Sequence, residues 1–330
     1  MPTTPPPIPG VHLRAFAGPS DFPAMVACAN ASFAADRTEF VTSVADMTRN
    51  YTTFTNCVPE RDVWVAEAGD EVAGYIRSFH WAQADGLQLY GQFGVVAPHW
   101  RRRGVGAALH AWVEARQREV AAAHRDAPRH QHHAFVTEGE TARMALLEKA
   151  GYHRERYFLT MVRPTLDALP DYPLPSGLEL RPVQPAHYRA IWDASVDAFR
   201  SHWGYSPPDE ADYRQWLGSR VFQPHLWQIA WDTQAGEVAG QVRTYIDETW
   251  NAGNQLKRGW TEFISVRERW RRRGLARALI VRSLRAQAEA GMTESGLGVD
   301  SENLNGATRV YEDCGFGVVK KNCVFRKALV

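Results

Sequence analysis

Two short stretches of the chain place three consecutive arginines directly before a glycine. The first is PHWRRRGVGAALH, from Pro98 to His110, and the second is ERWRRRGLARALI, from Glu268 to Ile280. Apolar residues follow each glycine at helical spacing, which predicts a helix that begins at the basic turn. Free backbone N–H groups at a helix start bind anions, glycine lets a phosphate oxygen approach the backbone, and arginine supplies charge and donors. Each turn therefore has the residues of a phosphate site.

A solvated basic helix start, or a sporadic nucleic-acid contact, is the alternative interpretation of such a turn. The pattern occurs twice, each time between a strand-like segment and an amphipathic segment, and this favours phosphate binding. The residues expected to contact the anion are Arg101, Arg102, Arg103, Gly104, Val105 and Gly106 in the first turn, and Arg271, Arg272, Arg273, Gly274, Leu275 and Ala276 in the second.

The elements that position these turns are also repeated. Gly274 follows Gly104 by 170 positions, and DEVAGYIRS, from Asp70, matches GEVAGQVRT, from Gly236. A repeat of this length predicts a duplicated domain rather than a solenoid. The predicted domains are residues 1–164 and 178–330, joined by a Pro-rich linker over 165–177.

Each half has the same predicted order of strands and helices. A short strand and a helical segment come first, and a hairpin follows, with its turn at Gly69-Asp70 in the first half. The strands GQFGVVA and TEFISVR then enter the basic turns. Beyond the turn come a helix, a strand, a second helix that ends at a glycine-aromatic pair, and a final strand. Interleaved strands and helices predict a mixed α/β fold. The stretch HRDAPRHQHH, from His124 to His133, could suggest metal ligands, but its irregular spacing beside proline and arginine favours a solvated loop.

Composition narrows the class of protein. The chain has 330 residues and a formal net charge of +1, so nucleic acid and anionic membranes are not expected partners. It has no apolar run long enough to span a bilayer, and its first ten residues, MPTTPPPIPG, are expected to be a Pro-rich lead-in rather than a signal peptide. The four cysteines show no metal-binding spacing, so we expect reduced thiols, no metal and a cytoplasmic location. A monomer and a homodimer both remain open.

The basic turns resemble the acetyl-CoA loop of the GNAT acyltransferase superfamily, whose signature is Q/R-x-x-G-x-G/A after a strand ending V-x-P. The stretch VAPHWRRRGVG fits this signature, and VRERWRRRGLA fits it except that Glu268 replaces the proline. The resemblance covers nearly the whole chain as two tandem copies and is closest to the tandem group that includes mycothiol synthase. It implies that the loop amides hold the CoA pyrophosphate and that pantetheine lies along the preceding strand. The strand residues so implied are Gly94, Val95 and Val96 in the first half and Ile264, Ser265 and Val266 in the second.

The resemblance also implies two catalytic residues, and only the second half has them. An alkylammonium acceptor with a pKa of about 10.4 needs a base at neutral pH, and the family often uses a glutamate on the strand before the loop, here Glu262. The thiolate of CoA is often protonated by a tyrosine, here Tyr311 of YEDCGF. The matching residues of the first half are Gln92 and Leu147, which cannot serve. A surface strand residue and a core aromatic are the alternative interpretations of Glu262 and Tyr311.

Two further predictions concern the cofactor and the acceptor. The family's Asn-x-x-Ala pattern is shifted in ENLNGATRVY, and we favour Asn303 over Asn305 as the residue that lies near CoA or caps the helix. The acceptor is expected to contact the aromatic segment after the first helix of the second half, at His202, Trp203 and Tyr205, with Tyr213 and Trp216 as further candidates. Packing of these aromatics onto the sheet is the alternative.

These observations predict an acetyl-CoA-dependent N-acetyltransferase. The acetyl group would pass by direct attack to a primary amine of a small molecule, with the C-terminal half catalytic and the N-terminal half degenerate. CoA is expected to bind at least the C-terminal half, and the first loop keeps the same cradle. The alternative is a non-catalytic acetyl-CoA-binding regulatory module.

Overall fold

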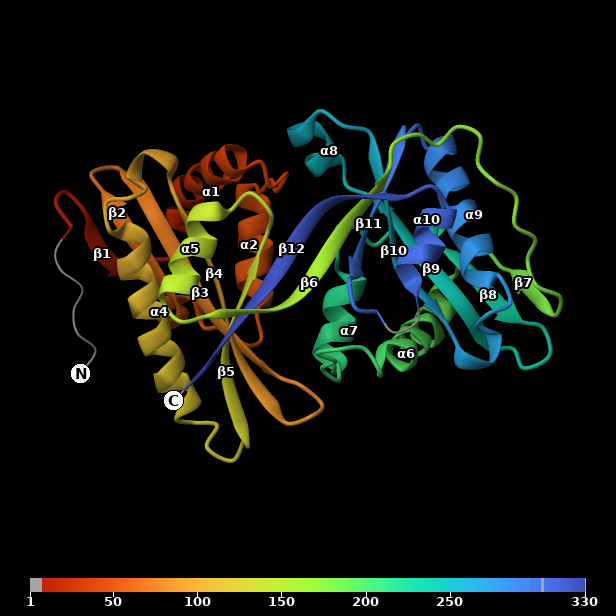
Figure 1. The fold of residues 1–330 in the computed structure, drawn as a ribbon, viewed down its shortest axis with the longest axis horizontal. Helices are drawn as coiled ribbons and strands as arrows, with labels where there is room; N and C mark the ends of the chain where they lie inside the picture. Colours follow the sequence, from red (N-terminus) through yellow and green to blue (C-terminus); the bar gives the residue numbers. More distant parts are fainter. Residues whose placement is uncertain (1–7, 304–305, 330) are drawn as a thin grey trace. The chain divides into compact units, whose positions relative to one another are not determined.

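The computed structural model describes residues 8–303 and 306–329, and the chain divides into two compact units (Figure 1). Unit 1 contains the described residues up to Arg156 together with those from Asn322 onward, and unit 2 contains Tyr157–Lys321. Each unit combines a sheet with helices, so the predicted mixed α/β class is confirmed. The predicted lead-in falls mostly outside the described residues.

The elements of unit 1 follow the predicted order. Its helices, apart from single 3₁₀ turns, are α1 (Phe22–Asp36), α2 (Val44–Thr53), α3 (Pro59–Asp62), α4 (Val105–Ala121) and α5 (Thr141–Lys149). Its strands are β1 (His12–Ala15), β2 (Val63–Ala68), β3 (Glu71–Ala82), β4 (Leu87–Val96) and β5 (Arg129–Val136), and β6 (His153–Arg163) starts in it.

Unit 2 has the same order with one exception, since its third helix lies between its third and fourth strands, whereas the third helix of unit 1 precedes its second strand. Its helices are α6 (Tyr188–Phe199), α7 (Glu210–Leu217), α8 (Glu248–Asn254), α9 (Leu275–Glu289) and α10 (Ala307–Asp313). Its strands are β7 (Leu178–Leu180), β8 (Gln228–Asp232), β9 (Val238–Ile246), β10 (Arg258–Val266) and β11 (Glu294–Asp300), and β12 (Gly317–Ala328) starts in it.

The strand orders of the two units correspond to each other. In unit 1 the order is β1-β2-β3-β4-β5-β12, and in unit 2 it is β7-β8-β9-β10-β11-β6. The pairs β4/β5 and β10/β11 are parallel, and the pairs on either side of them are antiparallel. Alternate strand residues face opposite sides, so each sheet has two apolar layers, one under α1 or α6 and one under α4 or α9.

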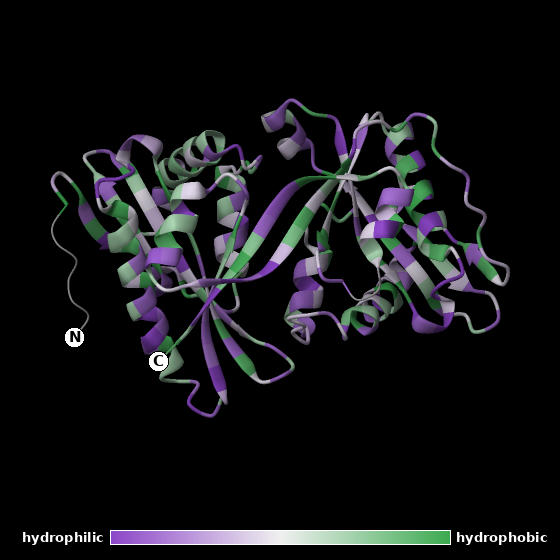
Figure 2. Cartoon of the chain, in the orientation of Figure 1, coloured by the Kyte–Doolittle hydropathy of each residue, from purple (hydrophilic) through white to green (hydrophobic). Residues whose placement is uncertain are grey.

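The two halves exchange their last strands. Residues of β6 after Arg156 belong to unit 2, where Phe158–Arg163 pair with β11, and the end of β12 belongs to unit 1, where Cys323–Ala328 pair with β5. In Figure 2 both strands mix hydrophobic and hydrophilic residues along their length. The units therefore differ from the predicted boundaries at 164 and 178. The reason is that backbone hydrogen bonds can join a strand to any open sheet edge, whichever repeat the strand comes from.

The predicted linker contributes side chains to the core of unit 2, and the predicted histidine loop is partly a strand. Between 165 and 177 the chain has no helix or strand, yet Leu166 is buried and Tyr172 packs against the core of unit 2. The solvated-loop interpretation of HRDAPRHQHH is wrong for its second half. Residues from Arg129 onward form β5, and the side chain of His132 is completely buried.

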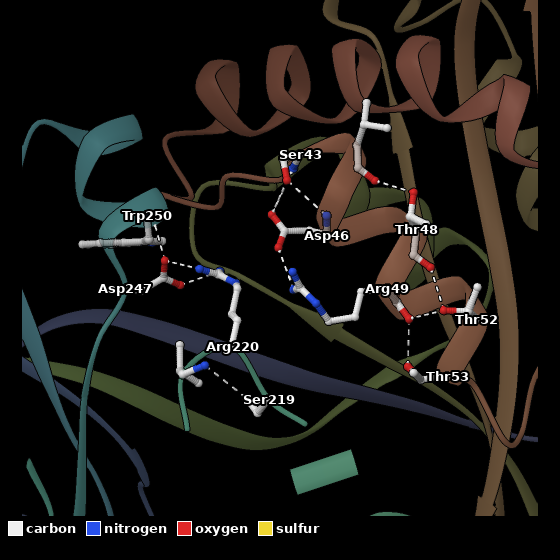
Figure 3. Close-up of polar contacts among 12 residues, drawn as sticks. Ser43, Asp46, Thr48, Arg49, Thr52, Thr53, Ser219, Arg220, Asp247 and Trp250 are labelled. Carbon is white, nitrogen blue, oxygen red and sulfur yellow. Dashed lines mark hydrogen bonds and ion pairs between the residues drawn. The ribbon is translucent and has the colours of Figure 1, made fainter. Parts of the chain in front are cut away.

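Side-chain caps fix two helix starts inside the units (Figure 3). At α2, Ser43 Oγ accepts from the N–H of Asp46 at 3.1 Å, and the Asp46 carboxylate accepts from the N–H of Ser43 at 3.2 Å. At α8, Asp247 accepts from the N–H of Trp250 at 2.9 Å and forms an ion pair with Arg220. In residues 8–303 and 306–329, no helix is long and apolar enough to cross a bilayer.

Candidate active site

The two basic turns adopt the same backbone conformation. Arg102 and Arg272 have positive φ angles of 64° and 59°, and the glycines that follow are left-handed N-caps with φ of 94° at Gly104 and 83° at Gly274. Helices α4 and α9 start directly after these glycines, and their first N–H groups have no carbonyl partner within the helix. Both turns therefore have the geometry of an anion site.

The arginines on either side of the left-handed residue hold the turn itself. The first arginine of each turn donates to the carbonyl that ends the preceding strand, and the third lies over the tryptophan before the turn. The contacts are Arg101 Nε to Val96 O at 3.3 Å, Arg271 Nε to Val266 O at 3.1 Å, and the Cζ atoms of Arg103 and Arg273 at 4.9 Å and 5.0 Å from the ring centres of Trp100 and Trp270. Part of the basic charge thus shapes the loop. Arg102 and Arg272, which lie between these arginines, are exposed.

The surroundings of the two turns differ. Arg101 forms a bidentate ion pair with Asp36 of α1, with N···O distances of 2.7 Å and 2.8 Å, whereas Arg271 has no carboxylate partner in the described part of the chain. A Cβ placed on Gly104 would lie 3.7 Å from Ile8, whereas one on Gly274 would meet no described atom within 4 Å. The second turn is therefore the more open and the less neutralised of the two.

The strands that enter the turns differ as well. In unit 1, β4 pairs with β3 without interruption, from Gln88 through Gly94 to Val96. In unit 2, Glu262 pairs with Arg243 but Ser265 pairs with Gln241, so β10 contains one extra residue. This is a β-bulge, and Phe263 within it has a φ of +49°. The bulge leaves backbone groups of β10 unpaired at the strand region where the cofactor is predicted to lie.

The parallel ladder beside the bulge also ends early. In unit 2, β10 pairs with β11 only from Arg258 to Trp260, whereas in unit 1 the pairing of β4 with β5 continues to Gln92. Beyond Trp260, the carboxylate of Glu262 accepts a hydrogen bond of 2.9 Å from the N–H of Gly298 on β11. A side chain thus occupies the place of a ladder partner at the point where the two strands part.

The environment of Glu262 suits a proton acceptor at neutral pH. Burial raises the pKa of its carboxyl to about 7, although the N–H groups of Gly298 and Phe263 act in the opposite direction. A base is most effective when its pKa is close to the working pH. The side chain is half-buried, so the interpretation of Glu262 as an ordinary surface residue does not fit its surroundings.

Tyr311 lies on α10 with its ring in the apolar layer under α9. It is buried, and both burial and the negative charge of Glu262 raise the pKa of its hydroxyl. In the described part of the chain, this hydroxyl has no hydrogen-bond partner, so the ring packs as a core aromatic while its proton is uncommitted. The matching residue of unit 1, Leu147, is a fully buried core residue on α5.

In unit 1, the position that matches Glu262 is closed by a polar network. Gln92 is buried, and its amide donates to the hydroxyl of Tyr152 at 2.9 Å and lies 3.2 Å from His110 Nδ1. His110 in turn lies 3.3 Å from Glu114, which accepts from Lys327 of the exchanged strand β12 at 2.7 Å. These partners hold Gln92 as a structural residue. No local pattern predicts that they meet, because they come from distant parts of the chain.

The predicted acceptor residues lie on the segment after α6. His202 is half-buried; burial lowers the pKa of its ring, and Asp300 and Arg271 have opposite effects on it. The pKa of His202 therefore depends on charged residues at the end of β11 and in the second basic turn. Trp203 lies 6.3 Å from Phe158, centre to centre, and the N–H of Tyr205 bonds to the carbonyl of His202.

The two further aromatic candidates contact neighbouring aromatic rings, as the packing interpretation expects. Trp216 stacks on Trp227 at 5.5 Å, and Tyr213 lies against Trp192 at 5.5 Å. Aromatic residues that contact each other in this way build a core layer.

Asn303 does not cap α10. The N-cap of that helix is Gly306, with a φ of 65° and no side-chain hydrogen bond, and the carbonyl of Asn303 accepts from the N–H of Gly306 at 3.2 Å. The competing candidate, Asn305, lies outside the described residues. Among the remaining predicted contacts, the side chains of Val105 and Leu275 are buried in the cores, so only their backbone N–H groups are available to a ligand.

One residue beside the site was missed in the sequence. Arg243 lies directly opposite Glu262 in the register of β9 and β10 and is 4% exposed. Its signal was a lone basic residue inside the apolar strand segment GEVAGQVRT, repeated as Arg77 in DEVAGYIRS. Within residues 8–303 and 306–329, no group of three or more His, Cys, Asp or Glu side chains is arranged to hold a metal ion.

Known families match both halves of the chain. Residues 188–316 match the acetyltransferase (GNAT) family, and residues 59–154 match an acetyltransferase (GNAT) domain. The mycothiol acetyltransferase of Kineococcus radiotolerans is 32% identical over 255 residues, 74% of either chain. That of Geodermatophilus obscurus is 28% identical over 265 residues, 78% of this chain and 79% of the relative.

Solved structures agree with the tandem arrangement. A GCN5-related N-acetyltransferase from Sphaerobacter thermophilus superposes with a TM-score of 0.73 and 25% identity, covering 97% of this chain and 96% of that one. A tandem GNAT protein from the clavulanic acid biosynthesis pathway superposes with a TM-score of 0.67 over 97% of this chain and 99% of its own. Its 18% identity shows likeness of fold alone.

Proposed function

The chain belongs to the GNAT family of acetyltransferases, and on that premise we propose that it acetylates a primary amine of a small molecule, with unit 2 as its catalytic unit. The observation that carries this proposal is the altered strand β10. It alone of the two equivalent strands combines a bulge, an early end to the parallel ladder and a carboxylate at the point of divergence. Unit 1 keeps the fold and the basic turn without these features.

The residues of unit 2 fit an acetyl-CoA molecule. Acetyl-CoA, the cosubstrate of GNAT acetyltransferases, supplies an acetyl group as a reactive thioester. Gly274 and the first N–H groups of α9 would hold its pyrophosphate, helped by Arg271 and Arg272, which have no carboxylate partner in the described part of the chain. The backbone of β10 beyond its last pair with β11, from Phe263 to Ser265, would bind the pantetheine amides as a strand-like partner.

The same unit provides a path for the protons of the reaction. Glu262 would take one proton from the acceptor ammonium, directly or through water, so that the neutral amine forms the N–C bond as the C–S bond breaks. A backbone N–H freed by the bulge would stabilise the negative charge that develops on the carbonyl oxygen. Tyr311 would give its proton to the departing sulfur and regain one from the acetylated nitrogen. The proton on Glu262 would then return to solvent, which balances the reaction.

Neutralising the acceptor is what a base must achieve here. An alkylammonium with a pKa of about 10.4 is mostly protonated at pH 7, and its deprotonation there costs roughly 4.6 kcal/mol. A carboxylate with a pKa of about 7, as burial gives Glu262, is half ionised at that pH and accepts a proton far better than an exposed glutamate would. The matching residue of unit 1, Gln92, has an amide in place of a carboxylate and cannot act as this base.

The test is the release of free CoA thiol from acetyl-CoA in the presence of a panel of amines. The panel should include the unacetylated precursor of mycothiol, because the curated relatives are mycothiol acetyltransferases. We expect at least one amine to accelerate release and to gain the mass of an acetyl group. If acetyl-CoA binds while no amine in a broad panel accelerates release, the chain is a binding module and the proposal is wrong.

A further inference from the structure

Arg243 is a buried guanidinium that the fold does not neutralise. It lies between two aromatic rings, with its Cζ 4.0 Å from the ring centre of Phe263 and 5.2 Å from that of Trp216. Nη2 donates to Ser195 Oγ of α6 at 3.1 Å. Nε and Nη1 are buried without a hydrogen-bond partner, and no carboxylate of the described residues lies within ion-pair distance.

Burying an arginine without a counter-ion lowers the stability of the folded protein. A buried charge without a counter-ion loses its hydration and is retained only when something else compensates. Elsewhere in unit 2 the fold does compensate, since the equally buried Arg258 forms an ion pair of 2.6 Å with Glu294. The rings over Arg243 offset part of the cost, but they cover its faces and leave N–H groups at its edge unused. Burial accordingly lowers the pKa of Arg243 to about 9.

The position of Arg243 connects it to the proposed base. Arg243 and Glu262 are directly opposite each other on β9 and β10, so their side chains start on the same face of the sheet with Cβ atoms about 5 Å apart. They do not form an ion pair, because Glu262 turns to Gly298 on β11 while Arg243 turns to Ser195 on α6. The face therefore presents a negative and a positive group that start side by side and point apart.

We propose that Arg243 binds a carboxylate of the acceptor, so that the natural substrate of unit 2 is a small zwitterion with its amine toward Glu262. This inference rests on the proposed function and narrows its substrate class. A carboxylate would supply the missing hydrogen-bond acceptors and the counter-ion in one group. Phe263, which closes over the guanidinium, is the bulged residue itself. The bulge in β10 therefore shapes both the site for the amine, beside Glu262, and the site for the carboxylate, beside Arg243.

The first repeat offers a matched control. Arg77 occupies the equivalent position on β3 and also lies among aromatic rings, with its Cζ 4.0 Å from the ring centre of Phe54. Its partner across the strand is Phe93 rather than an acid, so the pairing of opposite charges is missing there. Arg77→Met changes the same side chain in a comparable setting without touching the proposed site.

The experiment compares acceptors that differ only at the far end. Amino acids with two to four carbons between amine and carboxylate are paired with alkylamines of equal length, and kcat and KM are measured for wild type, Arg243→Met, Arg243→Lys and Arg77→Met. We expect wild type to prefer the carboxylated member in kcat/KM by about 10- to 100-fold, mainly through KM. Arg243→Met should bring the ratio near one, Arg243→Lys should restore part of it, and Arg77→Met should leave it unchanged.

A binding measurement gives the inference a second readout besides turnover. Short alkanoates, which carry the carboxylate without the amine, should raise the thermal unfolding temperature of wild type and Arg77→Met but not of Arg243→Met. If uncharged amines are acetylated as well as amino acids, or if the ratio survives in Arg243→Met, the carboxylate inference fails while the acetyltransferase proposal stands. If no amine is acetylated at all, both fail. If Arg243→Met does not fold, the kcat/KM ratio of carboxylated to uncharged acceptors is compared between wild type and Arg243→Lys.

Discussion

Among the individual side chains, Glu262 is subject to two opposed effects. Burial raises the pKa of its carboxyl, while the N–H groups of Gly298 and Phe263 favour the charged form, and burial prevails at a pKa of about 7. The folded state therefore holds a proton that the unfolded chain releases near its ordinary pKa of 4.5. Stability linked to this group is present below about pH 4.5 and is lost as the pH rises to about 7.

Replacing Glu262 with glutamine should remove this pH dependence. The variant has no charge to bury, so it should equal wild type in stability near pH 4.5 and exceed it above pH 7 by on the order of 1–3 kcal/mol. Denaturant unfolding at pH 4.5 and pH 8 measures the difference. An advantage of the same size at both pH values would mean that the carboxyl titrates normally and is not poised for neutral pH.

Tyr311 and Leu147 occupy matching positions and predict opposite outcomes. Tyr311→Phe removes a hydroxyl that has no partner in the described part of the chain, so stability should hardly change, while kcat falls and the KM for acetyl-CoA stays nearly constant. Leu147→Ala opens a cavity at a fully buried site and should cost about 2–5 kcal/mol of unfolding free energy without altering the chemistry of folded molecules. Rates normalised to the folded fraction check both. Full activity in Tyr311→Phe would place the proton donor elsewhere.

Among the secondary-structure elements, the strand, basic turn and helix of each repeat have similar conformations but different surroundings. Both turns share left-handed residues and the same arginine contacts. Only the second turn follows a bulged strand, and only the first has its leading arginine neutralised by Asp36. The turn supplies an anion site in either case, and the strand before it decides whether a reaction centre can form.

The glycines of the turns provide a matched test. Gly274→Val and Gly104→Val place the same branched side chain at a left-handed N-cap, so the backbone strain should be similar, roughly 1–3 kcal/mol each. Gly274→Val should also block the approach of a phosphate to the start of α9 and weaken CoA binding strongly, with acetylation lost. Gly104→Val should leave turnover per folded molecule near wild type. Calorimetry that shows unchanged CoA binding in the double variant would refute the loop assignment.

The sequence predicted these elements unequally well. The basic turns, the helices after them and the hairpin at Gly69-Asp70 were readable because glycine, apolar spacing and alternation are local signals. The bulge at Phe263 was not readable, because one extra residue in a strand shows only against its partner strand. Nor was the burial of His132, whose polar ring is accommodated by Gln117 across the unit. Arg243 could be recognised in the sequence as a charged residue in an apolar strand. Its lack of hydrogen-bond partners depends on the tertiary structure and could not be predicted.

For the chain as a whole, each repeat contributes its last strand to the other unit. Unit 2 is completed by β6, which is encoded at the end of the first repeat, and unit 1 is completed by the end of β12. Lys327 on the exchanged strand also neutralises the buried Glu114 of unit 1. Neither repeat therefore carries a complete sheet of its own, and an unpaired edge of β5 or β11 would be prone to aggregate.

Fragments should follow the units rather than the repeats. Residues 157–321 contain every strand of unit 2, so this fragment should be monomeric and unfold cooperatively, whereas residues 178–330 leave the edge of β11 open and should aggregate or pair. Sedimentation and thermal unfolding of the two fragments separate these outcomes. A stable monomer from residues 178–330 and not from 157–321 would show that the strand exchange is not required for folding.

We assign the chemistry to unit 2 alone, and this assignment has a direct test. It is tested most directly by amine-dependent CoA release per folded molecule, from pH 6 to 10, for wild type, Glu262→Gln and Gln92→Met. We expect Glu262→Gln to lose about 10²- to 10⁴-fold at pH 7 and to recover partly as the pH approaches the pKa of the acceptor, with the wild-type rise near pH 7 abolished. Gln92→Met should match wild type throughout. Wild-type rates at pH 7 in Glu262→Gln, or lost chemistry in a folded Gln92→Met, would contradict the assignment of the active site.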